Sequence, residues 1–452
     1  MADIRTLSAE VVIVGGGPAG INAALAAGRG GASGILVERY GFLGGMSTAA
    51  LVYPWMTFHT LEGKQVIGGI AEEIVARLKA MNASPGHVRD TVGYVNTITP
   101  YSPEVYKVLV LDLLRAAGVK LLLHSFVDEV EVQGERITRV QLTSKSGRIN
   151  LRGSVFIDTS GDADIAYLSG APTLQGREED KLTQPMTMKF RMRGVNLAKV
   201  KEYMLTHPDE FYHKTPFSEL ADLPLSGVMG FYKHWQEADL PIPRKEVLFF
   251  TGPAPDEVLV NSTRIQGLDG TDVEALTEAE ELGRRQVLQI ADFMTKRLPG
   301  FEQTSISQVG SQIGIRETRR IVGQYTLEAT DVVQGRRFED VIARSGYPID
   351  IHAPTGAGEQ DKSVWVTGDG AYDIPYRCLL PQKISNLLVA GRCISTFHEA
   401  LATTRLSPSC MATGQAAGTA AALSIKTECE PAEIAVAQLQ TLLLQSSALL
   451  DL

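Results

Sequence analysis

The sequence has few cysteines, and their spacing excludes several kinds of redox and metal site. Its four cysteines show no C-x-x-C pattern, which argues against a thioredoxin-like pair and against the usual zinc or iron–sulfur frameworks. Asp350 and His352 offer two metal ligands without a third, so we expect no metal centre. Reduced thiols in a cytoplasmic protein are the expectation that follows.

Positive charge and long apolar runs are also scarce. The formal net charge is −9 and no basic stripe is present, which argues against nucleic-acid binding, because that affinity comes largely from phosphate neutralisation. No apolar run approaches the ~20 residues that span a bilayer. The N-terminus lacks a cationic region followed by an apolar one, so we expect no signal peptide. A chain of 452 residues is expected to divide into two domains.

The most informative segment that is present is residues 11–38, VVIVGGGPAGINAALAAGRGGASGILVE. An apolar strand runs into a Gly-x-Gly-x-x-Gly turn and then into a helix of small residues. Gly15 permits the tight turn, and Gly17 lets the backbone approach a pyrophosphate at the N-terminus of the helix. Gly20 lets that helix pack closely on the sheet. These features predict a dinucleotide-binding βαβ unit.

The flanking residues fit the same prediction. Pro18 and Ala19 fall in the first turn of the helix, where proline is tolerated. Glu38 ends the second strand, where a carboxylate accepts hydrogen bonds from a ribose diol and disfavours a 2′-phosphate. The pattern leaves both NAD and FAD open.

Downstream, the patterning predicts helices over residues 69–81 and 103–117, a three-stranded β-meander over 127–151 and a core strand over 155–158. Between residues 165 and 384 the composition changes, which indicates a separate substrate domain. A Thr277-x-x-Glu280 capping box predicts the start of a helix there.

The dinucleotide-domain pattern returns near the C-terminus. We expect a buried strand over residues 386–390 and a small-residue helix from Ser409 to Leu423. The predicted organisation is therefore a cofactor domain made of residues 1–164 and 385–452, with a substrate domain of residues 165–384 inserted. This prediction also allows parts of residues 165–384 to pack within the cofactor domain.

Two features favour FAD over NAD. A β-meander interrupts the parallel sheet, and a late strand–helix pair returns to it, unlike the contiguous domain of an NAD dehydrogenase. No second Gly-x-Gly-x-x-Gly follows a strand, so there is no sign of a separate nicotinamide domain.

On these residues the chain resembles the FAD-dependent oxidoreductases of the glutathione-reductase-like class. More narrowly, it is similar to a bacterial family whose motifs stand here at residues 38–48, 156–164, 314–323, 372–381 and 386–423. The resemblance implies an α/β fold, with an FAD-binding Rossmann-like domain of glutathione-reductase type, a β-meander and an inserted mixed α/β substrate domain. It implies FAD bound extended, with adenosine near Glu38 and the flavin near Gly44, Gly45 and the C-terminal helix.

A more distant likeness is to the flavoprotein subunits of fumarate reductase and succinate dehydrogenase. A His and an Arg of residues 393–409 stand in comparable places, which suggests a dicarboxylate substrate. Those subunits often link their flavin to a histidine after the first βαβ unit. Residues 44–48 contain none, so we expect non-covalent FAD.

The expected cofactor contacts come from the glycine turn, the following loop, the meander, two strand ends and the C-terminal helix. The N–H groups of Met411 and Ala412, at the positive end of that helix, are predicted to reach flavin O2; a plain packing helix is the alternative. The predicted set is Gly15, Gly17, Pro18, Ala19, Gly20, Glu38, Arg39, Gly44, Gly45, Met46, Val127, Gly161, Asp162, Gly391, Arg392, Ser409, Met411 and Ala412.

For the chemistry, we expect His398 to move a proton, because its pKa allows both forms near neutral pH. Arg405 is expected to orient a carboxylate or polarise a carbonyl. A structural histidine and an Arg405–Glu399 ion pair are the alternatives. His352, Tyr372 and Arg377 are further candidates placed to cover the flavin.

Two other features are interpreted as structural. The charged run over residues 316–320 is expected to form an ion-pair network. Cys410 is expected to be a small residue of the core.

These observations predict an FAD-dependent oxidoreductase that transfers a hydride between a small organic substrate and flavin N5. The alternatives are an oxidase with O2 as acceptor and a non-catalytic FAD-binding module. We expect a small-molecule substrate and an external electron donor or acceptor, with no nucleic acid and no membrane as partners. The substrate, the direction of reaction and the oligomeric state stay open, and a homo-oligomer is allowed.

Overall fold

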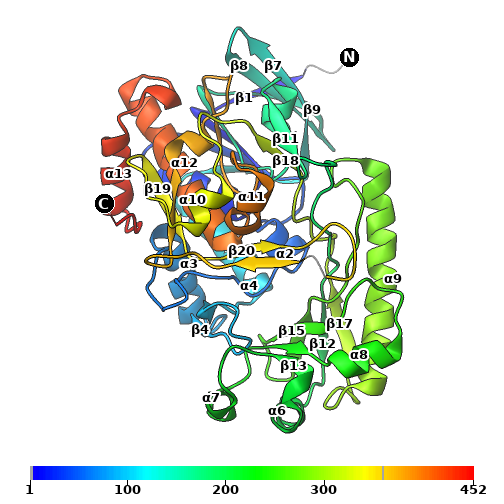
Figure 1. Cartoon of the computed structure of the whole chain (residues 1–452). Coiled ribbons are helices and arrows are strands. Elements are labelled where there is room, and N and C mark those ends of the chain that lie inside the picture. Colours follow the sequence, from blue (N-terminus) through cyan, green and yellow to red (C-terminus); the bar gives the residue numbers. More distant parts are fainter. Residues whose placement is uncertain (1–3, 359–360, 452) are drawn as a thin grey trace.

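The computed structural model describes residues 4–358 and 361–451. It has a mixed α/β fold with a five-stranded parallel sheet and a separate six-stranded antiparallel sheet, and the antiparallel sheet forms the lower end of the molecule in Figure 1. The elements between them connect the two sheets.

The parallel sheet is built from both ends of the chain. Its strand order is β23-β10-β2-β3-β6, and every neighbouring pair is parallel. Four of its strands consist of buried residues throughout, as near-continuous apolar runs predict for a sheet covered on both faces. The strands are β2 (Val11–Val14), β3 (Gly34–Val37), β6 (Lys120–Leu122), β10 (Val155–Asp158) and β23 (Leu387–Val389).

Helices α1 (Pro18–Arg29) and α12 (Ser407–Thr427) pack against each other beside this sheet. This close contact requires glycine in α12, because a side chain would collide with the backbone of α1. A Cβ atom at Gly414 would lie 2.1 Å from the Ala19 carbonyl oxygen, and one at Gly418 would lie 2.0 Å from that of Ala23. Around them lie α2 (Met46–Ala49), α3 (Gly69–Ala80), α4 (Pro103–Ala116) and α13 (Val436–Gln445).

A four-stranded sheet lies at the top of Figure 1. The predicted meander forms three of its strands; β8 has the predicted bounds, and β7 and β9 are longer than expected. The fourth, β1, was not predicted and runs parallel to β9. The order is β1 (Arg5–Ser8), β9 (Gly147–Arg152), β8 (Arg136–Ser144) and β7 (Ser125–Gln133).

The antiparallel sheet has six strands in the order β13-β14-β15-β16-β12-β17. It is green at the lower right of Figure 1, with the long helix α9 along one side. Its strands are β12 (Phe190–Arg193), β13 (Phe211–Tyr212), β14 (Gly227–Gly230), β15 (Val247–Thr251), β16 (Glu257–Val260) and β17 (Ser305–Val309). Its helices are α6 (Leu197–Thr206), η1 (Pro208–Glu210), α7 (Phe217–Asp222), α8 (Tyr232–Ala238) and α9 (Val273–Arg297).

The predicted start of α9 is wrong. The helix begins five residues earlier, where the Asp272 carboxylate caps it by accepting a hydrogen bond from the Ala275 N–H at 2.8 Å. Thr277 lies inside the helix, and its hydroxyl donates to the Val273 carbonyl oxygen at 2.8 Å. The capping-box pattern is therefore coincidental here.

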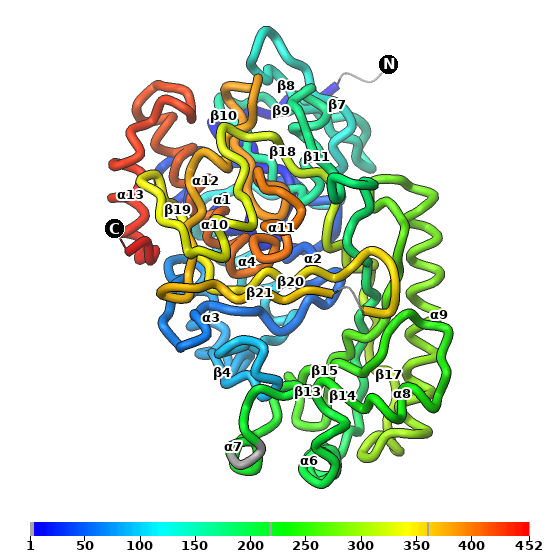
Figure 2. Tube along the Cα trace, in the orientation of Figure 1, coloured from blue at the N-terminus to red at the C-terminus, as the bar shows by residue number. Residues whose placement is uncertain are grey.

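Part of the expected substrate domain packs on the nucleotide side. The apolar core that contains α1 and α12 also contains Leu327, Ile342 and Ile374. Figure 2 shows the ladder of β20 and β21 crossing the middle of the molecule. The connecting ladders are β4 (Val88–Arg89) with β5 (Thr97–Ile98), β11 (Thr173–Gln175) with β18 (Arg319–Ile321), β19 (Val341–Ser345) with β22 (Tyr372–Pro375), and β20 (Ile349–Ile351) with β21 (Lys362–Val364).

The remaining short helices complete the connection. They are α5 (Asp164–Leu168), α10 (Ala329–Val333), η2 (Tyr376–Leu379), α11 (His398–Thr404) and η3 (Pro431–Glu433).

Candidate active site

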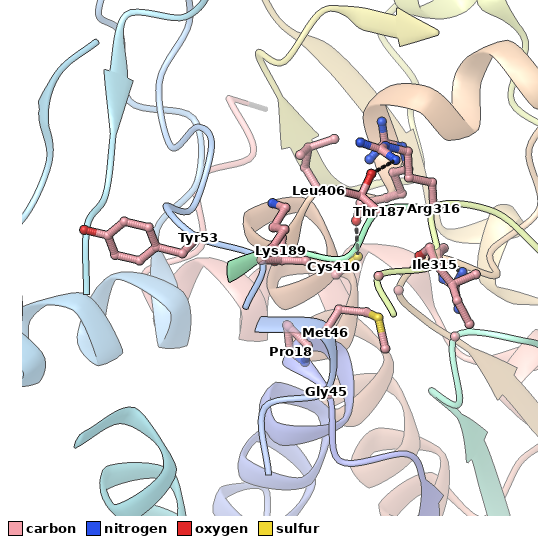
Figure 3. Close-up of a pocket in the computed structure, with 18 of the residues that line it drawn as sticks. Pro18, Gly45, Met46, Tyr53, Thr187, Lys189, Ile315, Arg316, Leu406 and Cys410 are labelled. Carbon is pink, nitrogen blue, oxygen red and sulfur yellow. Dashed lines mark hydrogen bonds between the residues drawn. The ribbon is translucent and has the colours of Figure 1, made fainter. Parts of the chain in front are cut away.

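A cavity of about 400 Å³ lies beyond the carboxyl ends of the parallel strands, where ligands bind in open α/β sheets. Its wall combines residues from the glycine turn, from the antiparallel sheet and from the start of α12. Figure 3 shows Pro18 and Gly45 on one side and Lys189 and Arg316 on the other. The cavity therefore joins the two sheets.

The glycine turn has the conformation that the sequence predicts. Gly15 has φ +103°, and Gly17 is the N-terminal cap of α1. A Cβ atom at Gly20 would lie 1.8 Å from the Gly15 carbonyl oxygen, so Gly20 serves packing and does not line the cavity. A Cβ at Gly17 would meet nothing closer than 3.7 Å. The space in front of Gly17 thus remains free for a pyrophosphate to approach the N–H groups of the turn.

Glu38 lies at the other side of this turn and is only 5% exposed. Its carboxylate accepts hydrogen bonds from the backbone N–H groups of Gly16, at 2.7 Å, and Tyr40, at 3.0 Å. Burial raises the pKa of Glu38, and these hydrogen bonds oppose the shift. Both carboxylate oxygens are thus held by backbone N–H groups. Glu38 also lines the cavity, as expected for a group that binds ribose.

Arginines and strand ends complete this part of the wall. Arg39, Val127, Gly161, Gly391 and Arg392 all line the cavity, together with Ala19 and Met46. Asp162 does not. Its carboxylate accepts hydrogen bonds from Arg392 at 2.6 Å and from the Thr318 hydroxyl at 2.7 Å, so it positions Arg392. Gly44 also lies off the cavity, and its φ of +110° serves the turn into α2.

Helix α12 begins earlier than predicted. Leu406 is its cap, Pro408 stands in the first turn, and Ser407 and Cys410 line the cavity. The first-turn N–H groups belong to Ser407 and Ser409.

This start changes the predicted N–H contacts. Met411 and Ala412 lie further inside the helix and do not line the cavity, so their N–H groups are taken up by the helix. The Ser409 hydroxyl is also turned away, toward the hydroxyl of Ser345 at 3.0 Å.

Three predicted catalytic side chains do not line the cavity. His398 is buried, and its Nδ1 atom lies 2.9 Å from Glu317 Oε1. Tyr372 is fully buried against the Thr403 hydroxyl. Arg377 is half exposed and pairs with Asp340 at 2.9 Å. Each is engaged elsewhere in the fold, so we correct the prediction that these residues contact a substrate.

Arg405 and His352 do line the cavity. Arg405 Nη2 is 3.4 Å from the Asp350 carbonyl oxygen, and its buried Nε has no hydrogen-bond partner among the described residues. The His352 ring lies 3.3 Å from Asp350 and 3.6 Å from Asp361. Burial alone would raise the pKa of Asp350, but His352 and Arg405 hold it well below its ordinary range.

Sequence reasoning missed Lys189 and Arg316, which both line the cavity. Arg316 belongs to the charged run that was expected to form ion pairs. That expectation holds for Arg319, which pairs with Asp164, and for Arg320, which pairs with Glu317. Arg316 instead donates to the Thr187 hydroxyl at 2.5 Å, as Figure 3 shows.

A match to one known family identifies the class of protein. Residues 10–443 match the family model described as FAD dependent oxidoreductase. The chain belongs to this family. FAD is accordingly its cofactor, and the glycine turn, Glu38 and the space before Gly17 fit that dinucleotide.

Three solved structures that match the chain are distant from it in sequence. One is a geranylgeranyl bacteriochlorophyll reductase-like protein from Thermoplasma acidophilum, with 11% identity, 97% of this chain and 84% of that chain covered, and a TM-score of 0.48. Another is p-nitrophenol 4-monooxygenase from Pseudomonas putida, with 11% identity, coverages of 98% and 81%, and a TM-score of 0.45. A third is a flavin-dependent monooxygenase in complex with FAD and substrate, with 13% identity, coverages of 93% and 58%, and a TM-score of 0.39.

A search of curated proteins found no significant match to this FAD-dependent oxidoreductase. Within residues 4–358 and 361–451, no helix has the length and hydropathy to cross a membrane. The same residues contain no cluster of three or more His, Cys, Asp or Glu side chains arranged to hold a metal ion.

Proposed function

We propose that this FAD-dependent oxidoreductase transfers a hydride between a small organic substrate and non-covalently bound FAD. The continuity of the cavity supports the proposal, because one wall carries the dinucleotide turn and the opposite wall carries apolar side chains of the antiparallel sheet and polar side chains of its connecting segments. A substrate on that second wall would face the cofactor.

The residues that would hold the cofactor follow from their chemistry. The N–H groups of the glycine turn bind a pyrophosphate, and Glu38 accepts hydrogen bonds from a ribose. Arg39 and Arg392 add positive charge beside the phosphates. The first turn of α12, at Ser407, directs its N–H groups and positive dipole into the cavity. When bound, FAD supplies a two-electron acceptor or donor.

Arg405 and His352 are the groups that we assign to the substrate. The unpaired Nε of Arg405 is free to donate a hydrogen bond to a carboxylate or carbonyl oxygen. His352 lines the cavity between two carboxylates, which fix the orientation of its ring, and we assign it the proton transfer. It replaces His398 in this role, because His398 does not reach the cavity.

An anaerobic screen tests this proposal. The purified protein, loaded with FAD, is mixed with small organic acids and alcohols, and loss of visible flavin absorbance is followed by admission of air. With a substrate found, Arg405→Gln is expected to lower kcat/KM roughly 10- to 100-fold, as loss of one charge-assisted hydrogen bond predicts.

Arg377→Gln is the matched control, because Arg377 lies outside the cavity, and it is expected to leave kcat/KM unchanged. A protein that binds no FAD after reconstitution contradicts the proposal as a whole. Equal kcat/KM for Arg405→Gln and the wild type removes Arg405 from the substrate site.

A further inference from the structure

Three basic side chains meet at the end of the cavity that lies away from the glycine turn. They are Lys189, Arg316 and Arg405, and all three line the wall. Figure 3 shows Lys189 and Arg316 projecting from neighbouring segments toward the same space. In addition to burial, repulsion from Arg316 and Arg405 lowers the pKa of Lys189, and repulsion from Arg405 lowers the pKa of Arg316, as expected of like charges near one another.

The alternation of the chain before β12 explains why Lys189 points into the cavity. Met186, Met188 and Phe190 are buried in the core of the antiparallel sheet. In an extended segment, side chains alternate between faces. Thr187 and Lys189 therefore face the opposite side, and both line the cavity.

The partners of Arg316 fix its direction. Its Nη1 atom donates to the Pro185 carbonyl oxygen and to the Thr187 hydroxyl, both at 2.5 Å. Residues 185–187 thus hold the guanidinium beside Lys189.

The acidic groups at this end are already engaged. Glu246 pairs with Arg244 at 3.1 Å, and Asp361 pairs with Arg264 at 2.7 Å. Asp350 is 3.3 Å from His352 and 3.9 Å from Arg405. Within the described part of the chain, neither Lys189 nor Arg316 has a carboxylate within ion-pair distance.

Lys189 is the most unusual member of the group. It is only 9% exposed, and no described side chain or backbone group accepts a hydrogen bond from its amine. Burial, with added repulsion from Arg316 and Arg405, lowers the pKa of Lys189 to about 7. Burial and the same kind of repulsion lower the pKa of Arg316 to about 9. An anion placed among them would relieve the repulsion.

We propose that Lys189, Arg316 and Arg405 together bind the carboxylate of an organic acid, which is the substrate class of this enzyme. The inference rests on the proposed function, since it assigns a substrate to the same cavity. Apolar and aromatic side chains also contribute to the cavity wall, and they would contact an apolar body on the acid. That wall contains Met229, Leu248, Phe250, Tyr94 and Tyr347.

The site makes anion binding depend on pH. Below about pH 7 the Lys189 amine is protonated before the acid arrives, and above that pH the acid must bind together with a proton. The affinity for a carboxylate therefore falls as pH rises through this range. The other charged groups that face this end form two pairs, Asp350 with His352 and Arg244 with Glu246, whereas Lys189 has no carboxylate within ion-pair distance among the described residues.

The test uses sodium benzoate and benzamide as a matched charged and neutral pair, added to the oxidised FAD-loaded protein. Binding is measured by calorimetry and by the change in the visible flavin spectrum. We expect benzoate to bind at least tenfold more tightly than benzamide near pH 6. Lys189→Met should weaken benzoate roughly tenfold or more, as loss of one charge-assisted hydrogen bond predicts, and leave benzamide unchanged.

Two further variants sharpen the result. Lys189→Arg keeps the charge at every accessible pH, so benzoate binding should persist and lose its pH dependence. Lys199→Met, which removes an exposed lysine paired with Glu302, is the control and should behave as the wild type. FAD content and melting temperature show that each variant is folded, and Arg405→Gln provides the same comparison if Lys189→Met loses FAD.

Equal affinity for benzoate and benzamide in FAD-loaded wild type overturns the anion site while leaving the oxidoreductase proposal intact. Failure to bind FAD contradicts the oxidoreductase proposal instead. If Lys189→Met alters only the potential of the flavin and not benzoate binding, Lys189 serves the cofactor and the assignment is wrong.

Discussion

At the scale of single residues, the buried charges around His398 show why a histidine in a promising motif need not be catalytic. Glu317 is fully buried between His398, at 2.9 Å, and Arg320. Burial alone would raise the pKa of Glu317, but the hydrogen bond from His398 and the charge of Arg320 together hold it below its ordinary value. Removing one partner of such a group costs stability.

We expect His398→Ala to destabilise the fold by about 1–3 kcal/mol and leave the turnover of the folded protein nearly unchanged. The lowered pKa of Glu317 contributes stability above its unfolded value, which is lost as pH falls through the folded value. Without His398 the folded pKa moves up, so the variant should lose stability at a higher pH on acidification. Melting temperatures between about pH 7 and pH 4 measure both effects.

If His398→Ala instead abolishes turnover with no loss of stability, His398 acts on the substrate and its placement here is wrong. The N-cap of helix α11, which carries His398, is Phe397, so the substitution His398→Ala does not remove a cap.

The candidate site was only partly predictable from its residues. Gly15, Gly17 and Glu38 form a local pattern whose spacing by itself predicts a dinucleotide-binding unit. Arg316 and Arg320 stand in one run of charges, and only the tertiary fold decides that one enters the cavity and the other pairs with Glu317. Lys189 did leave a signal, since basic and polar residues alternate with three methionines and Phe190 over residues 186–192, as on a strand with one core face.

At the scale of elements, the pairing of α1 and α12 links cofactor binding to helix packing. Gly418 allows the two backbones to approach, because any side chain there would collide with the Ala23 carbonyl oxygen at 2.0 Å. Helix α1 begins at the glycine turn, and α12 begins at the cavity wall. A shift between the helices therefore moves both walls of the cofactor site.

Gly418→Ala is expected to lower stability by about 1–3 kcal/mol or more, as overpacking does, and to weaken FAD binding as well. Thr419→Ala, the next position on the same helix, adds no atom and should change FAD affinity little. Thermal unfolding and titration of the apo-protein with FAD measure the two effects. A variant with wild-type stability and affinity would show that this contact is not close in solution.

The sequence predicted long periodic elements better than their boundaries. Helix α4 carries its own signals, since Ser102 caps it and Pro103 follows. Helix α9 shows the opposite case, because the cap-like residues Asp272 and Thr277 lie five positions apart and the helix is capped by Asp272. The return of residues 325–380 to the nucleotide side depends on long-range contacts that no local pattern encodes.

At the scale of the whole molecule, the two ends of the chain form one parallel sheet, and the middle supplies the opposite wall of the cavity. A cofactor bound there contacts segments almost four hundred residues apart in the sequence. Binding to the native state alone stabilises it by about 2.7 kcal/mol at a hundredfold excess over Kd. The whole cavity should therefore respond to FAD as one unit.

Hydrogen exchange of the protein with and without FAD tests this claim most directly. We expect FAD to slow exchange together in the glycine turn at residues 15–20, in the strand end at 159–161 and at the start of α12, residues 405–410. Helices α6 and α7, beyond the antiparallel sheet, should be little affected. Protection confined to the N-terminal turn, with the start of α12 unchanged, would contradict a cofactor site shared by both ends of the chain.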